Sequence, residues 1–260
     1  MMAKRALVTG GAKRLGRAMA LYLAERGLDV AIHYAGSAED AAQTRAEIEA
    51  LGVRAACLQA DLLDLDATEA LVPRAAEALG GPLDVLVNNA SIFEYDTLKS
   101  ATRDSWNRHI GSNLQAPFLL TQAFAAQAPK AGLRDGEPVA TGLVVNMIDQ
   151  RVLKPTPEFM TYTIAKMGLW AFTRTAAQAL APAIRVNAIG PGPTMQGTRQ
   201  SAEHFARQRA ATILGRGAGP QDVVAALGYL LDADAVTGQI LCTDGGQHLA
   251  WQTPDVLGVE

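Results

Sequence analysis

The chain has 260 residues and a formal net charge of −3, with 49% apolar and 19% charged residues. This length fits one α/β domain over residues 1–260, and the composition excludes a disordered chain. The charge gives no electrostatic reason to bind nucleic acid or an anionic membrane, and no apolar run is long enough to span a bilayer. Two cysteines, Cys57 and Cys242, form neither a disulfide framework nor a metal cluster, so we expect a cytoplasmic protein.

The first predicted unit is a buried strand, a glycine-rich turn and a helix. The apolar run Ala3–Val8 forms the strand, and residues 9–16 lead into the helix. Backbone N–H groups and the helix dipole at such a start favour a pyrophosphate. The spacing is not G-x-G-x-x-G, because Arg14 stands where a middle glycine is common, and an ordinary βα turn is the alternative. The candidate cofactor residues here are Gly10, Lys13, Arg14, Leu15 and Gly16.

The second predicted strand, Asp29–Tyr34, ends without the acidic residue that usually holds the ribose 2′-hydroxyl of NAD. Ser37 can instead donate a hydrogen bond to a 2′-phosphate, and Lys13 and Arg14 come from the facing turn. The sequence therefore predicts NADP(H) as the cofactor. His33 on its own is equally compatible with a half-buried strand position. The candidate cofactor contacts at this strand end are His33, Tyr34 and Ser37.

Strands and helices continue to alternate along the chain. The further predicted strands are Val53–Gln59, Leu83–Val87, Leu143–Met147, Ile184–Ile189 and Gly238–Thr243. The predicted helices are Ala38–Leu51, Leu65–Leu79, Arg103–Ala128, Met160–Ala181 and Gln221–Leu231. Strands that are apolar throughout are typical of a parallel sheet covered on both faces. The pattern thus predicts a Rossmann-type, doubly wound α/β fold of about seven parallel strands with helices on both faces.

Ligands of such sheets bind beyond the carboxyl ends of the strands, where Thr9, Asn88 and Asn146 fall. Asp61, after the third strand, is placed either to contact an adenine ring or to cap the next turn. Pro117 predicts a kink or break in the long helix. Asn113 is a poor residue for a helix interior, so it serves a kink or a bound water.

Three stretches lack a regular pattern. We expect 130–141 to be a surface loop, and 194–217, with an amphipathic piece at 204–214, to be a candidate lid over a substrate. The tail 246–260 is either loose or docked on a neighbouring subunit. The apolar stripe that is expected to be core or subunit interface comprises Phe118, Leu119, Leu120 and Phe124.

Tyr162 and Lys166 are the candidate reacting pair. They lie four residues apart in a predicted helix, so both side chains share one face. A phenol with a pKa of roughly 10 is mostly protonated at neutral pH. A cation beside it favours the phenolate, so we expect the pair to donate or accept a proton near neutrality.

Five motifs, in their order along the chain, resemble those of the short-chain dehydrogenase/reductase family. They cover essentially the whole chain and are Thr9-Gly10 to Gly16, Asn88-Asn89-Ala90, Asn113, Tyr162-x-x-x-Lys166 and Pro191-Gly192. The resemblance implies a homotetramer in which Tyr162 donates the proton, and Lys166 holds the nicotinamide ribose and lowers the pKa of the tyrosine. Asn113 would position a water in a proton relay. The further cofactor contacts that it implies are Asp61, Leu62, Asn89, Ala90, Met147, Tyr162, Lys166, Pro191 and Gly192.

One departure from the family pattern is Asp149, which stands where a serine usually lies thirteen residues before the tyrosine. Its alternative interpretation is a surface acid in an altered site. Together with Arg14, His33-Tyr34 and Phe93, it resembles the pteridine reductases. That resemblance implies that Phe93 stacks on a pterin, although plain core is the alternative for this residue. The implied substrate contacts are Arg14, Ser91, Phe93, Asp149 and Tyr162, with Asp149 joining Tyr162 in proton transfer.

The expected function is NADPH-dependent reduction of a reduced pterin, such as dihydromonapterin, dihydrobiopterin or dihydrofolate. Such a substrate fits these residues, because a pterin is a flat, polar ring system that can stack on an aromatic side chain and form hydrogen bonds with a carboxylate. Gly36 departs from the arginine of some pteridine reductases, so affinity for NADPH would rest on Arg14 and Ser37. The alternatives are a carbonyl reductase of the ketoacyl, sugar or steroid type, which Asp149 disfavours, and a non-catalytic NADPH-binding protein.

Overall fold

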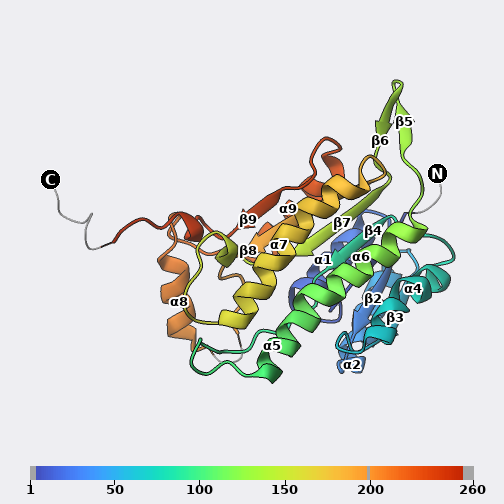
Figure 1. The fold of residues 1–260 in the computed structure, drawn as a ribbon. Coiled ribbons are helices and arrows are strands. Elements are labelled where there is room, and N and C mark those ends of the chain that lie inside the picture. The colour runs from blue at the N-terminus through green and yellow to red at the C-terminus, as the bar shows by residue number, and fades with distance from the viewer. Residues whose placement is uncertain (1–3, 198–199, 254–260) are drawn as a thin grey trace.

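The computed structural model describes residues 4–197 and 200–253, and it confirms the predicted Rossmann-type architecture (Figure 1). Seven parallel strands form one sheet in the order β3-β2-β1-β4-β7-β8-β9. The strands are β1 Arg5–Val8, β2 Asp29–Tyr34, β3 Ala55–Gln59, β4 Val85–Asn88, β7 Gly142–Met147, β8 Ile184–Pro191 and β9 Ile240–Thr243. The helices are α1 Arg14–Glu25, α2 Ala38–Ala50, α3 Leu65–Glu69, α4 Leu71–Leu79, α5 Arg103–Ile110, α6 Ala116–Gln127, α7 Met160–Leu180, α8 Ala202–Ala210 and α9 Pro220–Asp232.

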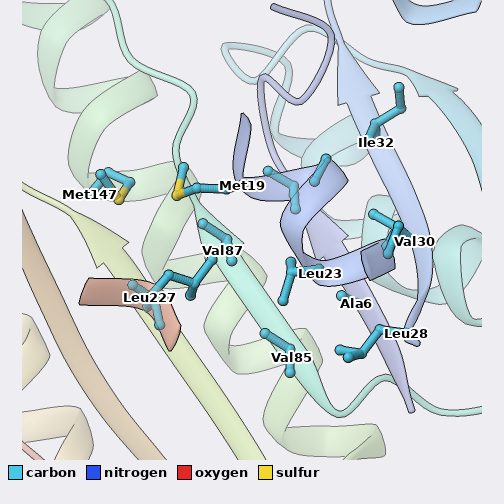
Figure 2. Packing of buried hydrophobic residues seen from close by; sticks show 14 of the residues in the cluster. Ala6, Met19, Leu23, Leu28, Val30, Ile32, Val85, Val87, Met147 and Leu227 are labelled. Carbon is cyan, nitrogen blue, oxygen red and sulfur yellow. The ribbon is translucent and has the colours of Figure 1, made fainter. Parts of the chain in front are cut away.

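Helices cover both faces of the sheet and bury two separate cores. On one face, Met19 and Leu23 of α1 and Leu227 of α9 pack against Val30 and Val87 of the strands (Figure 2). The core on the other face includes Leu71, Leu79, Leu86, Leu120, Phe124 and Val144. Burying one such side chain stabilises the fold by about 1.5–3 kcal/mol. The sheet is therefore a firm support for the loops at its ends.

Strands β1 and β4 lie side by side at the point where the order of the sheet reverses. Val8 pairs with Val87, and Asn88 pairs with Asn146 of the next strand. The N–H of Thr9 donates to the carbonyl of Val87 at 3.0 Å. Ligands of open α/β sheets bind outside the carboxyl ends of strands at such a point. The segments that follow β1, β4 and β7 therefore lie together at one end of the sheet, as predicted.

The expected surface loop at 130–141 is wrong, because this stretch contains a β-hairpin. Its strands are β5 Gly132–Arg134 and β6 Glu137–Val139, and Figure 1 shows them projecting from the body of the molecule. Asp135 and Gly136 form the turn with φ of +53° and +85°. Asp-Gly is a preferred pair for a two-residue hairpin turn of this kind. The Gly, Pro and charge content of the stretch concealed that signal.

The single helix expected at 65–79 is also wrong, because α3 ends at Glu69 and α4 begins at Leu71. Pro73 explains the break. Proline has no N–H to donate to the carbonyl of Glu69 four residues earlier, and its ring clashes with that carbonyl.

The break expected at Pro117 is confirmed. Helices α5 and α6 are joined by a π-helical turn, Gly111–Gln115, because Pro117 cannot donate to the carbonyl of Asn113. Asn113 is fully buried within this turn. Such π-helical turns occur frequently at functional sites.

The last third of the chain carries the candidate lid and the tail. Within 194–217, helix α8 spans 202–210 and so starts and ends earlier than the expected piece at 204–214. Ser201 caps this helix by accepting from the N–H of His204. Residues 198–199, and 254–260 of the tail, lie outside the described residues; the described tail holds a short 3-10 turn at Gln247–Leu249. Within the described ranges, no helix has the length and apolar character needed to cross a bilayer.

Candidate active site

The glycine turn after β1 is packed too closely for any larger residue at Gly16. A Cβ atom there would overlap the carbonyl oxygen of Gly10 and lie 2.6 Å from Nδ2 of Asn89. Gly10 itself has φ +62°, in the left-handed region that favours glycine. The Asn89 amide holds the turn by donating to the carbonyls of Thr9 at 2.8 Å and Gly10 at 3.2 Å.

The start of α1 therefore has the features of a phosphate site. Its first turn contains no acidic residue, and the tight turn brings the backbone close to whatever lies in front of the helix. This cradle fits the pyrophosphate of a dinucleotide. Leu15 and Gly16 lie in the first turn of α1, and their contact with a cofactor stays a prediction.

His33 is buried, and both of its ring nitrogens bind within the protein. Nδ1 accepts from the N–H of Gly10 at 3.1 Å, which leaves the proton on Nε2 for the carbonyl of Ala60 at 3.1 Å. Burial lowers the pKa of His33 below its usual 6.5. The imidazole thus connects the glycine turn to the end of β3. A hydrogen bond from His33 to a cofactor would require one of these two hydrogen bonds to break.

The region after β2 matches the prediction in part. Tyr34 ends the strand, and Ser37 precedes α2 without making a side-chain cap. Lys13, however, pairs with Asp40 of α2 at 2.8 Å, so a carboxylate stands close to the expected 2′-phosphate region. Sequence inspection of the strand end alone missed that acid.

A cleft of about 530 Å³ opens beside the carboxyl ends of β2, β3 and β4. Its lining includes His33, Gln59, Asp61, Leu62, Ala90, Ser91, Ile92 and Arg108. Oδ1 of Asp61 accepts from the N–H of Leu63 at 3.0 Å, so the carboxylate caps the next turn, which is one of its two predicted roles. The size and place of this cleft fit the adenosine half of a dinucleotide.

Tyr162 and Asp149 meet directly. The phenol donates to Oδ2 of Asp149 at 3.1 Å, and Oδ1 accepts from the N–H of Arg151 at 2.8 Å. Burial raises the pKa of Asp149 above its usual 3.8, against the opposing effects of Arg151, Tyr162 and Lys166. A carboxyl group with a raised pKa keeps a proton at higher pH. The predicted meeting of acid and phenol is confirmed.

The expected lowering of the tyrosine pKa is wrong for this structure. Burial, together with the charge and hydrogen bond of Asp149, raises the pKa of Tyr162 well above 10. Lys166 instead directs Nζ to the carbonyl of Met147 at 2.8 Å, and Nζ lies 5.7 Å from the centre of the Tyr162 ring. Burial lowers the pKa of Lys166 to about 8. Burial and the acid in place of the usual serine therefore act together against the phenolate.

Asn113 uses its amide to hold the backbone of Ile92. Nδ2 donates to the carbonyl of Ile92 at 2.8 Å, and Oδ1 accepts from its N–H at 2.9 Å. Of the two predicted reasons for an asparagine here, the irregular helix is confirmed. A role in a water relay stays a prediction.

Phe93 lies beside Tyr162 at the edge of an aromatic group that sequence inspection missed. Its ring stacks on Phe159 with centres 4.3 Å apart, meets Tyr162 edge-on at 4.7 Å, and is 44% exposed. Tyr95 and the Arg151 guanidinium also contact Phe159. The exposure excludes plain core for Phe93. Phe159, with φ +53°, carried no sequence signal.

Arg14 points toward the candidate lid. It has φ +52°, and its guanidinium donates to the carbonyls of Met195 at 3.3 Å and Gln196 at 3.1 Å. Ser91 is exposed and donates to the carbonyl of Ile92 at 3.3 Å. After Pro191, the N–H of Gly192 donates to the carbonyl of Thr243 at 3.1 Å. The described residues contain no group of three or more His, Cys, Asp or Glu side chains placed to bind a metal.

Comparison with known proteins places the chain in a family. A family model described as short chain dehydrogenase matches residues 4–207, so the chain belongs to the short-chain dehydrogenase family.

Three similar proteins carry three different activities in their names. FolM alternative dihydrofolate reductase 1 from Brucella suis, solved in complex with NADP, matches with a TM-score of 0.90 and 41% identity over 97% of this chain and 98% of that one. The 3-oxoacyl-(acyl-carrier-protein) reductase FabG of Staphylococcus aureus is 32% identical over 253 residues, covering 95% of this chain and 99% of the relative. The 3beta-hydroxysteroid dehydrogenase 1 of Eggerthella lenta is 35% identical over 95% of this chain and 94% of the relative.

Proposed function

We propose that this protein is an NADPH-dependent reductase of a reduced pterin, with dihydromonapterin, dihydrobiopterin or dihydrofolate as the substrate class. The observation that carries the proposal is the hydrogen bond from Tyr162 to Asp149 in a site where the family usually has a serine. A titratable pair suits the protonation of a ring nitrogen, whereas a serine hydroxyl suits the polarisation of a ketone.

The cofactor would lie along the carboxyl ends of β1 to β4. Backbone from Gly10 to Gly16 would hold the pyrophosphate, the cleft lined by Asp61, Leu62 and Ala90 would hold the adenosine, and Ser37 with Lys13 would meet the 2′-phosphate. The NADP bound to FolM of Brucella suis supports this choice. When bound, NADPH supplies the hydride.

The residues around Tyr162 would supply the proton. Asp149, whose pKa burial raises, shares a hydrogen bond with the phenol and can replace the proton that Tyr162 delivers. Lys166 is buried close by as a cation below pH 8 or so, and it offsets negative charge left on the pair. Tyr162 thus delivers the proton and Asp149 replaces it, and the remaining carboxylate takes up a proton from solvent before the next turnover.

The aromatic group would hold the pterin. Phe93 presents an exposed ring next to Tyr162, and Phe159 supports that ring from behind by stacking on it. An exposed aromatic ring that is held rigidly in this way can stack on a flat heterocycle such as a pterin. Ser91 and Arg14 lie on neighbouring segments as further substrate contacts, and Arg14 would link the substrate to the lid carbonyls of Met195 and Gln196.

A carbonyl reductase is the second candidate, favoured by the FabG relative and the steroid dehydrogenase relative. Either reductase would act in the cytoplasm as a homotetramer. Exposed apolar side chains on α6 and α7, which are Phe118, Ile164 and Met167, support contact between subunits. Sedimentation of the purified chain tests the subunit number.

The deciding experiment is NADPH oxidation by the purified protein against a panel of substrates. The panel contains three dihydropterins, a ketoacyl thioester and a diketone, with NADH run in parallel. We expect turnover with the dihydropterins and a preference for NADPH. Turnover confined to the carbonyl compounds would overturn the pterin proposal in favour of the second candidate.

A further inference from the structure

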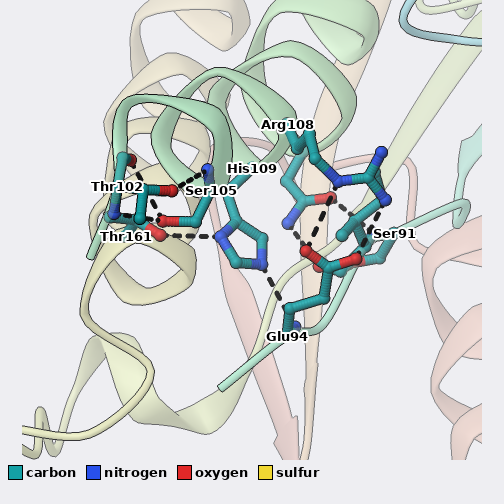
Figure 3. A network of polar contacts seen from close by, with 9 residues as sticks. Ser91, Glu94, Thr102, Ser105, Arg108, His109 and Thr161 are labelled. Atoms are coloured by element: carbon teal, nitrogen blue, oxygen red, sulfur yellow. Dashed lines mark hydrogen bonds and ion pairs between the residues drawn. The ribbon is translucent and has the colours of Figure 1, made fainter. Parts of the chain in front are cut away.

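His109 is the centre of a buried polar chain that joins the Phe93 segment to the start of α7. The ring has no solvent exposure, and its Nε2 accepts from the N–H of Glu94 at 3.1 Å. Its Nδ1 therefore carries the proton and donates to Oγ1 of Thr161 at 2.7 Å. Figure 3 shows the imidazole between these two partners. Glu94 follows Phe93 directly, and Thr161 precedes Tyr162 directly.

Asp96 completes the chain and anchors it. Its carboxylate accepts from the hydroxyl of Thr161, from the N–H of Thr161 at 3.2 Å and from the hydroxyl of Ser105 at 3.1 Å. Its carbonyl accepts from the N–H of Phe159 at 2.8 Å. Asp96 thus fixes the start of the helix that carries Tyr162 through its carboxylate, and Phe159, which supports Phe93, through its backbone carbonyl.

Glu94 is held from a second direction by the same turn of α5. Its carboxylate pairs with the guanidinium of Arg108 at 2.9 Å, and Arg108 lines the cleft beside β2 to β4. Adjacent residues of one helix therefore grip the backbone and the side chain of Glu94. The position of the segment that carries Phe93 is thus set by α5 together with the following π-helical turn, where Asn113 holds the backbone of Ile92.

Burial and the two hydrogen bonds of the imidazole favour one uncharged tautomer. Burial lowers the pKa of His109 below its usual 6.5, although Asp96 and Glu94 oppose this and Arg108 adds to it. The Tyr162 ring lies edge-on at 6.0 Å. A second proton would place an N–H on Nε2 against the N–H of Glu94, so protonation breaks the link to the Phe93 segment.

We propose that His109 is a positioning residue for the reductase site, which sets the spacing between the Phe93 ring and the Tyr162 hydroxyl through one hydrogen bond on each side. This inference rests on the proposed function insofar as Phe93 bears the substrate. It assigns His109 no contact with the reacting atoms.

The test compares three variants of the full chain with the wild-type protein. His109→Leu keeps apolar volume but removes the acceptor of the Glu94 N–H and the donor to the Thr161 hydroxyl. His109→Gln keeps one donor and one acceptor but cannot titrate. Thr68→Val is the control, because Thr68 is also fully buried and hydrogen-bonded, to the carbonyl of Asp64 at 2.8 Å, on a helix that carries no predicted site residue.

We expect His109→Leu to raise the KM for dihydrobiopterin by about tenfold or more, since unpaired buried groups disrupt their surroundings. The Kd of NADPH, measured by fluorescence titration, should stay within about twofold. His109→Gln should recover most of the KM, and Thr68→Val should leave it unchanged. A KM for His109→Leu within about twofold of wild type, or an equal rise in Thr68→Val, overturns the proposal.

The pH dependence gives a second test that does not require His109→Leu to fold. In the wild-type protein, the KM should rise as the pH falls through the pKa of His109, which burial places below its usual 6.5, and this rise should be absent in His109→Gln. The same rise in both proteins overturns the proposal. Absence of wild-type turnover with every dihydropterin would refute the proposed function instead, and the KM comparison would then use the carbonyl compound that is turned over.

Discussion

The molecule places two buried histidines in the two halves of its site, and they do different work. His33 lies in the cofactor half, where it ties the glycine turn to the end of β3. His109 lies in the substrate half, where it ties the Phe93 segment to α7. The cofactor half is formed by backbone and by residues close in sequence to strand ends. The substrate half depends on side chains from three separate segments, so we expect its changes to alter KM and turnover without altering cofactor affinity.

The largest expected effect is in the substrate half. Tyr162→Phe removes the proton donor and leaves the ring contacts with Phe93 intact. Turnover should fall by about 10²–10⁴-fold, as general acids contribute that much. The Kd of NADPH should stay within a few-fold, as checked by fluorescence titration. Retained turnover would remove Tyr162 from the donor role.

Gly16→Ala should impair the cofactor half of the site, so the affinity for NADPH should change and not only the turnover. The added methyl group would overlap the Gly10 carbonyl and press on Asn89, so the turn must open. We expect the Kd of NADPH to rise by at least about tenfold, a loss of about 1.4 kcal/mol. Equilibrium titration measures this change. Gly36→Ala is the matched control, because nothing lies within 4 Å of a Cβ there, and an equal effect in both variants would contradict the role of the turn.

Asp149→Asn should separate two steps in the pH profile of kcat. In the wild-type protein, activity requires protonated Asp149 and cationic Lys166, so it falls as pH rises through the raised pKa of Asp149 and again near 8. The amide removes the first step and lowers kcat by about tenfold or more. The remaining fall should lie at or below pH 8, because the Asp149 charge that helps keep Lys166 protonated is gone. An unchanged profile would exclude Asp149 from proton transfer.

Ser37→Glu is expected to give the smallest effect and concerns the cofactor half alone. A carboxylate near the 2′-phosphate should cost about 1 kcal/mol, or roughly fivefold in the Kd of NADPH. NADH affinity should be unchanged, and the ratio of the two dissociation constants measures the difference. Asp40 already pairs with Lys13 nearby, so Asp40→Asn should shift the ratio the other way. If neither variant changes the ratio, the 2′-phosphate lies elsewhere.

This contrast also explains how far the sequence could predict the structure. Strand periodicity and glycine spacing are local signals, so the sheet, the tight glycine turn and the helix shared by Tyr162 and Lys166 could be predicted. Proline is an equally local signal. It correctly predicts the break at Pro117, and Pro73 marks the break between α3 and α4 where a single helix is expected.

The substrate half was predicted less completely because its signals are not local. No spacing in the sequence relates Asp96, His109 and Thr161, which meet only after α5 packs against α7. Motif reasoning also assigned Tyr162 a lowered pKa from its lysine neighbour. The structure gives the opposite direction, because the phenol is buried and lies against Asp149, which accepts its hydrogen bond.

The β5–β6 hairpin offers a practical handle on the protein. It leads directly into the start of β7, so it belongs to the end of the sheet opposite the site, and Arg134 pairs with Asp234 after α9 at 2.7 Å. Its Asp135-Gly136 tip is a short polar turn, where inserted residues are tolerated best. An affinity peptide or a fluorescent label inserted there would immobilise or report on the enzyme while leaving both halves of the site free to work.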